Sequence, residues 1–276
     1  MPFFQRDGIR FHFREGGKGI PFFFQHGLGA SVDQPFDLLE PPAGFRLIAF
    51  DCRAHGQTSP LGDPEKITIG SFADDLLGLM ESLHLTKAVV GGISMGAAVA
   101  LNFALHFPHR VLGLILQRPA WLAEPNRRNA EIFGAVATLI RTHGASAGAE
   151  LFRRSALYTQ ILAESPDCAN SLLSQFDNPR ADETRLALER LPGDAPTLDR
   201  ADFRKVNCPV LVLANRQDPI HPFTFGECLA GEIPRAEFGE LTAKSVSVEA
   251  YRRDTRRFIS EFLRRHFANE RDSVLC

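Results

Sequence analysis

Short apolar runs alternate with helical patterns along most of the chain. Ile9 to Arg14 alternates apolar and polar residues, which is typical of a strand with one buried face. Other runs of strand length cover residues 21–25, 45–50, 88–90, 111–117, 209–214 and 236–240. This alternation predicts an α/β fold, with a mostly parallel central sheet and helices on both faces.

Three stretches between these runs have the spacing of helices. From Ser71 to Leu85, apolar residues recur on one face and acidic residues lie off it. Met95 to Phe107 is rich in small residues and stops before Pro108. The third stretch, residues 248–267, is amphipathic and predicts a final helix.

Residues 119–200 have a different pattern. This region is helical in spacing, rich in Ala, Arg and Leu, and interrupted by several prolines. We therefore predict a helical cap over 119–200, inserted into a core that is formed by 1–118 and 201–276.

The overall composition bounds the class of protein. A chain of 276 residues suits one α/β domain with an insertion. Its formal net charge of -2 gives no electrostatic footprint for nucleic acid or an anionic membrane. No apolar run approaches the roughly 20 residues of a membrane helix. Five cysteines, with no C-x-x-C spacing, indicate neither a disulfide framework nor a metal site, so we expect a cytoplasmic protein.

The strongest chemical signal is the segment 91–96, which contains G-x-S-x-G around Ser94. It follows a predicted strand directly and opens a predicted helix. In that context the serine occupies a sharp turn that projects its hydroxyl above the sheet. The helix N-terminus behind it favours developing negative charge. We therefore predict that Ser94 is a nucleophile.

A second turn, residues 26–29, follows the strand at 21–25. An oxyanion hole needs two backbone N–H groups aimed at one point. We predict that Met95, directly after the nucleophile, supplies one and that Leu28 in this Gly-rich turn supplies the other. His26 is expected mainly to support the turn, and it is also a candidate for the substrate pocket.

The combined motifs resemble the α/β-hydrolase superfamily along nearly the whole chain. The matching segments are His26-Gly27, residues 51–56, the turn at Ser94, and residues 209–218, which look like the strand that ends in the family's acid. The resemblance implies the fold, and it leaves the substrate open, because the superfamily includes esterases, lactonases, lyases and cofactor-free oxygenases. A serine at the turn argues against the branches that carry Asp there.

The resemblance implies Asp218 as the acid of a triad, but the base departs from the family pattern. The loop after the last predicted strand, residues 241–247, contains no histidine. Three interpretations remain open. His221, three residues after the acid, has taken over as base. Alternatively, Lys244 is the base, which requires a lowered pKa. In the third interpretation there is no base, and the chain binds a ligand without cleaving it.

We therefore predict a serine hydrolase that cleaves an ester or related acyl bond of a small apolar molecule through an acyl-enzyme, without metal or cofactor. Trp121 and Arg118 are further candidates for the substrate pocket. A silent binding protein, or a lyase or cofactor-free oxygenase on the same scaffold, is the alternative. The sequence leaves open the oligomeric state, including a homodimer.

Overall fold

The computed structural model describes residues 2–268 and contains one eight-stranded sheet, in the order β1-β2-β4-β3-β5-β6-β7-β8. The strands are β1 (Phe3–Arg6), β2 (Ile9–Gly17), β3 (Ile20–Gln25), β4 (Phe45–Phe50), β5 (Ala88–Ile93), β6 (Val111–Gln117), β7 (Val210–Ala214) and β8 (Ala236–Glu240). β1 and β2 pair antiparallel at one edge, and β2 is antiparallel to β4. The other pairings, from β4 through β3 to β8, are parallel.

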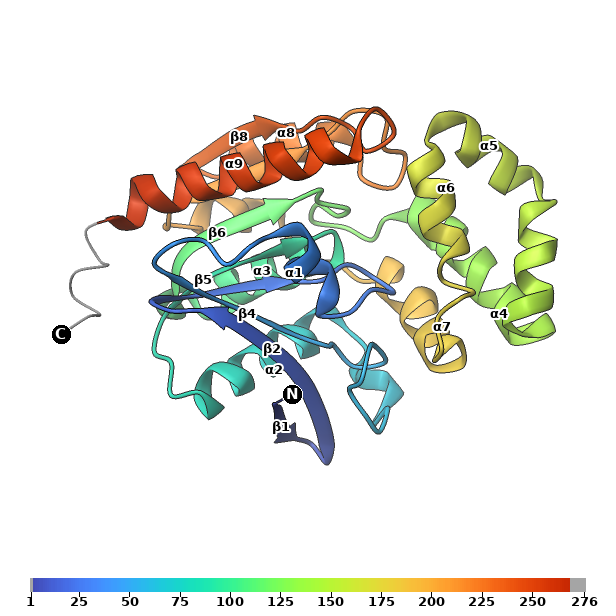
Figure 1. Ribbon diagram of the computed structural model, residues 1–276, viewed down its shortest axis with the longest axis horizontal. Helices are drawn as coiled ribbons and strands as arrows, with labels where there is room; N and C mark the ends of the chain where they lie inside the picture. The colour runs from blue at the N-terminus through green and yellow to red at the C-terminus, as the bar shows by residue number, and fades with distance from the viewer. Residues whose placement is uncertain (1, 269–276) are drawn as a thin grey trace.

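Helices cover both faces of this sheet (Figure 1). The helices of the core are α1 (Asp33–Leu38), α2 (Ile69–Ser82), α3 (Met95–His106), α8 (Phe223–Glu232) and α9 (Val248–Phe267). Short 3₁₀ helices are formed by Pro64–Lys66, Pro108–Arg110, Leu191–Gly193 and Arg200–Lys205. The α/β fold class predicted from the sequence is confirmed. β1 and α1 are additions that the hydrophobic pattern did not predict.

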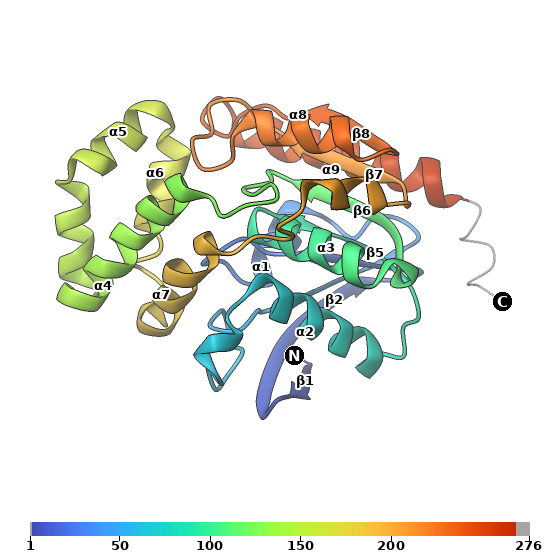
Figure 2. The ribbon, with the colours of Figure 1, turned by 180° about the vertical axis from the view of Figure 1, so that it is seen from behind.

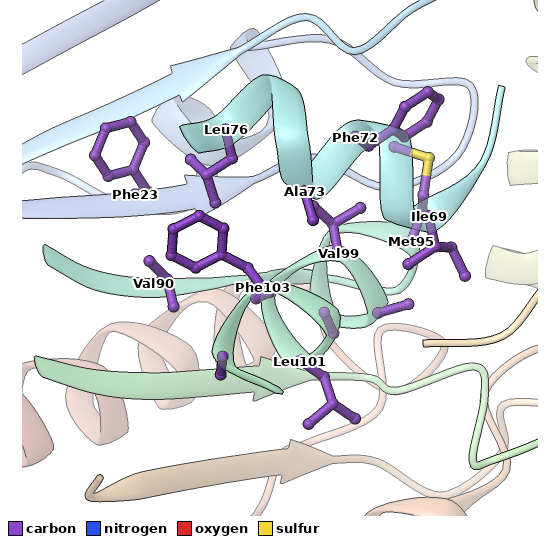
Figure 3. Close-up of a cluster of buried hydrophobic side chains, with 14 of the residues drawn as sticks. Phe23, Ile69, Phe72, Ala73, Leu76, Val90, Met95, Val99, Leu101 and Phe103 are labelled. Carbon is purple, nitrogen blue, oxygen red and sulfur yellow. The ribbon is translucent and has the colours of Figure 1, made fainter. Parts of the chain in front are cut away.

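The alternation of side chains along the central strands builds two separate cores. Phe23 and Val90 point to one face, where they pack with α2 and α3 (Figure 3). Their neighbours Phe22 and Val89 point to the other face, where they pack with α1 and α9. Because successive strand residues face opposite sides, a strand with both faces covered is apolar throughout. This explains why these runs in the sequence are almost continuously apolar.

The segment between β6 and β7 carries four helices and, among its described residues, adds no strand to the sheet. These helices are α4 (Arg127–Arg153, kinked at Gly144), α5 (Ala156–Glu164), α6 (Pro166–Leu173) and α7 (Ala181–Arg190). They gather at one end of the molecule (Figures 1 and 2). We call them the helical insertion. They have their own apolar core, which also includes Ile220 from the loop after β7. The boundaries of a cap at 119 and 200 stay a prediction.

Candidate active site

Ser94 lies in the turn between β5 and α3. Its backbone has φ 56° and ψ -112°, an unfavourable conformation for a residue with a side chain. Its N–H donates to the carbonyl of Gln117 over 2.9 Å, which ties the turn to β6. A Cβ at Gly92 would lie 2.5 Å from the backbone of Gly96, and one at Gly96 would lie 2.3 Å from the Gln25 carbonyl oxygen. The two glycines therefore permit the close approach that this turn requires.

The turn after β3 is held by side chains on both sides of Leu28. The N–H of Gly27 donates to Oε1 of Gln34 over 2.7 Å, and the N–H of Gly29 donates to Nε2 of His55 over 3.0 Å. Leu28 lines the same small cavity as Ser94. Met95 is the first residue of α3 and is fully buried. The predicted oxyanion-hole residues thus lie in two fixed turns, and their role stays a prediction.

His26 is a structural residue of this turn. It is fully buried, and its Nε2 accepts a hydrogen bond from the N–H of Cys52 over 3.1 Å. Its Nδ1 therefore carries the proton and donates to the Gly27 carbonyl over 2.8 Å. Burial lowers the pKa of His26 to about 4. Because His26 does not line the cavity at Ser94, its candidacy for the substrate pocket does not match this cavity.

Asp218 and His221 contact each other in the loop after β7. Nδ1 of His221 lies 2.9 Å and 3.0 Å from the two carboxylate oxygens of Asp218, and the backbone N–H of His221 donates to the same carboxylate. An ionised carboxylate can only accept hydrogen bonds, so Nδ1 carries the proton and donates it. Nε2 is therefore the basic nitrogen of the ring. Nε2 is buried and has no hydrogen-bond partner among the described residues. Two residues that are three positions apart in one short loop thus form a direct side-chain contact.

Arg118 pairs with the same carboxylate. It follows β6 directly, and its Nε donates to Asp218 over 2.7 Å. The guanidinium and His221 together hold the pKa of Asp218 well below its usual range, despite burial. The thiol of Cys168, on α6, donates to the other carboxylate oxygen over 3.3 Å. Asp218 is therefore an ionised carboxylate whose two oxygens both accept hydrogen bonds.

Ser94, His221, Arg118 and Lys244 line one cavity of about 70 Å³. It lies at the carboxyl ends of β5, β6 and β7, where parallel α/β sheets bind their ligands. The structure therefore brings together the predicted nucleophile and both predicted candidates for the base. The apolar part of the lining includes two residues of the helical insertion and consists of Leu28, Ile93, Phe133, Leu172 and Ile220.

Ser94 and His221 do not form a direct hydrogen bond in this structure, although they share the cavity, because Nε2 has no partner. If His221 is the base, its ring nitrogen should come within hydrogen-bond reach of the Ser94 hydroxyl, or somewhat farther when no ligand is bound. In enzymes without substrate such contacts are often long and tighten only when substrate binds. The geometry therefore brings the predicted nucleophile Ser94 and the candidate base His221 to one cavity without a direct hydrogen bond between them.

Trp121 does not line this cavity. It is buried against α3 in the core, where it borders a separate space with Ala97, Leu101 and Leu229. The expectation that Trp121 contributes to the pocket at Ser94 therefore does not match the structure. An isolated tryptophan in an apolar segment gives no direction for its ring, so the sequence could not distinguish core from pocket.

Lys244 is in the loop between β8 and α9. Its side chain is 29% exposed, and its ammonium lies 3.9 Å from a carboxylate oxygen of Asp167 on α6. It also lies 5.1 Å from the centre of the Tyr251 ring. Burial and the nearby Arg118 lower the pKa of Lys244 from its ordinary value. The ammonium of Lys244 thus lies at the edge of the cavity.

Two residues of the helical insertion that sequence reasoning missed support this site. Asn129 on α4 donates through its side-chain amide to the Ile220 carbonyl over 2.9 Å, which anchors the loop that carries His221. Asp167 faces both Lys244 and Arg118, at 3.9 Å and 3.7 Å. Neither residue has a motif around it, because its role depends on how the insertion folds back on the core.

Across residues 2–268, no group of three or more His, Cys, Asp or Glu side chains could hold a metal ion. None of the helices in the described part of the chain combines the length and the apolar composition needed to cross a membrane.

Two known proteins resemble this chain in sequence over most of its length. The chain is similar to 3-oxoadipate enol-lactonase 2 of Acinetobacter baylyi, with 26% identity over 201 residues that cover 73% of this chain and 72% of that protein. It is also similar to the putative carbamate hydrolase RutD of Variovorax paradoxus, with 29% identity over 234 residues that cover 81% and 79% of the two chains.

A solved structure and a family profile extend the similarity to the fold. The enol-lactonase from Burkholderia xenovorans superposes with a TM-score of 0.71 at 22% identity and covers 95% of this chain and 99% of that one. The family model described as alpha/beta hydrolase fold matches residues 20–244. This range includes the strands of the candidate site and the turns that follow them. The chain is therefore a member of the α/β-hydrolase fold family, as its motifs indicated.

Proposed function

We propose that this protein is a serine hydrolase that cleaves an ester or lactone through an acyl-enzyme on Ser94. The observation that carries the proposal is the bond between His221 Nδ1 and Asp218, which leaves a buried, basic Nε2 beside the cavity that Ser94 lines. The names of the relatives support the same class, since one is called an enol-lactonase and the other a putative carbamate hydrolase.

The proposed reaction begins when the hydroxyl of Ser94 attacks the carbonyl carbon and His221 Nε2 takes its proton. Asp218 orients the ring and stabilises the imidazolium. The N–H groups of Leu28 and Met95 donate to the oxyanion of the tetrahedral intermediate. The intermediate collapses, and the leaving alcohol takes the proton from His221. Water then attacks the acyl group on Ser94 with the same histidine as base, and this releases the acid.

His221 is the better candidate for the base than Lys244. Burial lowers the pKa of His221 below its ordinary value, so the ring is neutral and able to accept a proton near pH 7. Lys244 starts from a much higher pKa, and its ammonium has the carboxylate of Asp167 nearby, which favours the charged form. A charged ammonium cannot accept the proton of Ser94.

The helical insertion is proposed to act as a cap over the pocket. Phe133 and Leu172 reach the cavity from α4 and α6, and they offer an apolar surface to the acyl part of a small substrate. A cytoplasmic setting completes the proposal, on the ground that the five cysteines show no spacing typical of a disulfide framework.

Hydrolysis of chromogenic esters and lactones by the wild type and by Ser94→Ala tests the proposal. We expect turnover by the wild type and a loss of several orders of magnitude in the variant, as when a triad member is removed. Wild-type protein that binds these compounds without hydrolysing them would support the silent binding alternative instead. Turnover that survives Ser94→Ala would exclude the acyl-enzyme.

A further inference from the structure

Two cavities meet at Lys244. The inner cavity, of about 70 Å³, contains Ser94 and His221. An outer pocket of about 410 Å³ lies between α1, the loop after β8 and the start of α9. Gln34, Ile93 and Lys244 line both. The inner cavity has room for only a few water-sized groups, so a substrate that reacts at Ser94 must extend past Lys244 into the outer pocket.

The charged residues that line the inner cavity are all basic. They are Arg118, Lys244 and the titratable His221, and no Asp or Glu of the described chain is among the lining residues. The nearest carboxylates do not line the inner cavity. Asp218 is turned toward Arg118 and His221, and Asp167 lines only the outer pocket. The inner wall therefore presents positive charge to whatever occupies it.

Arg118 and Lys244 differ in how closely each is paired with a carboxylate. The Nε of Arg118 donates to Asp218 over 2.7 Å within a buried pair, so this cation is committed to the acid. The ammonium of Lys244 has one long ion pair, 3.9 Å to Asp167, among the described residues. An ammonium has three donors on a flexible stem. Lys244 is thus the cation with the weaker carboxylate partner, and its ammonium can turn to a ligand.

We propose that Lys244 binds an anionic group of the substrate, so that the preferred substrates are esters or lactones that carry a carboxylate on the acyl side. This inference rests on the proposed function, because it assumes that the acyl group sits at Ser94. The carboxylate replaces the distant Asp167 as the main partner of the ammonium, at the junction of the two cavities. A charge-assisted hydrogen bond there contributes both affinity and orientation.

Matched substrates test this proposal. The 4-nitrophenyl half esters of succinate, glutarate and adipate carry a free carboxylate, and the corresponding methyl 4-nitrophenyl diesters do not. We expect the wild type to prefer an anionic member over its neutral partner in kcat/KM. Lys244→Met should reduce that preference on the order of ten-fold, mainly through a higher KM of the anionic ester, and Lys244→Arg should retain most of it.

The control is Lys87→Met, because Lys87 is exposed and precedes β5, at the opposite end of the strand from Ser94. It should leave the preference as in the wild type. A preference that is the same in Lys244→Met and the wild type overturns the proposal. An equal loss for both esters also overturns it, since that result assigns Lys244 to the proton transfer or to the fold.

Binding separates this proposal from the hydrolase assignment. Calorimetry with Ser94→Ala measures the binding of monomethyl glutarate, which carries one charge, and of neutral dimethyl glutarate. Tighter binding of the anion that is lost in Ser94→Ala/Lys244→Met supports the proposal even if no ester is hydrolysed. Equal binding of the two compounds, or a preference that survives without Lys244, contradicts it.

Discussion

Arg118 Nε lies 2.7 Å from Asp218 Oδ2, although 100 positions separate the two residues in the chain. Arg118 follows β6 and Asp218 follows β7, and these strands are neighbours in the sheet. Nδ1 of His221 contacts the same carboxylate. One buried carboxylate therefore contacts both a permanent cation and a titratable ring, so the charges of Arg118 and Asp218 both act on the pKa of His221.

Replacing Arg118 with Met should shift the pH dependence of kcat/KM. The guanidinium lowers the pKa of His221, so its loss should raise that pKa and move the acidic limb to higher pH. Stability should also fall by about 3 kcal/mol, because the variant leaves a buried carboxylate with one partner fewer. Rate profiles and chemical unfolding measure the two effects. Arg216→Met, which removes an exposed side chain paired with Glu240, is the control. An acidic limb at the same pH in Arg118→Met and the wild type would show that Arg118 does not affect the pKa of His221.

Replacing His221 with Ala should reduce kcat by about three to four orders of magnitude, as expected for the base of a triad. Steady-state kinetics with the chromogenic esters measure the loss. His109→Ala, in an exposed 3₁₀ turn after α3, should behave as the wild type. An enzyme that keeps most of its activity without His221 would remove this residue from the mechanism and return attention to Lys244.

The wild-type rate should rise with pH along a limb centred below 6.5. Burial disfavours the imidazolium and lowers the pKa of His221 from its ordinary value, so the basic form is already present in mildly acidic solution. Initial rates of a neutral ester between about pH 4.5 and 9 measure the limb. A limb in the alkaline range would instead indicate a lysine base.

Acid should destabilise the fold through the two buried histidines beside the turn at Leu28. Burial lowers the pKa of His26 to about 4 and that of His55 to about 3. The unfolded chain, with ordinary values near 6.5, therefore binds more protons than the native one at intermediate pH. The free energy of unfolding should fall as pH drops below about 6.5, by about 3 kcal/mol for His26 alone once pH 4 is reached.

Urea unfolding at several pH values measures this slope. His26→Gln should reduce the slope of the free energy of unfolding against pH, whatever its effect on stability at neutral pH. His143→Gln, which replaces an exposed histidine, is the matched control and should leave this slope as in the wild type. A free energy of unfolding that is constant between about pH 4 and 7 would show that these rings are not neutral and buried in solution.

Much of the site could be predicted because its parts are local in sequence. The turn at Ser94 needs only a strand, two glycines and a helix in order, and the structure has β5 and α3 at these positions. The contact between Asp218 and His221 spans three residues within one loop. In both cases, neighbouring residues specify the geometry, so pattern reasoning was sufficient to bring these residues together.

The rest depends on strand order and on how the insertion folds back. Arg118 was predicted only as a candidate for the substrate pocket, and it lines the cavity, but the sequence did not identify Asp218 as its partner. Nothing in the sequence says that β6 lies beside β7. Likewise, Asp167 reaches Lys244 only because α6 returns to the edge of the cavity. Partners so distant in sequence are set by tertiary packing, which periodicity does not encode.

The central claim is that His221 and Asp218 activate Ser94, and labelling with a fluorophosphonate measures this most directly. Intact-mass analysis of the folded wild type should show one adduct, which peptide mapping assigns to Ser94. The adduct should be absent in Ser94→Ala and form far more slowly in His221→Ala, because the alkoxide character of the serine depends on the base. A folded wild type that gains no mass, or an adduct that forms as fast without His221, would contradict the account.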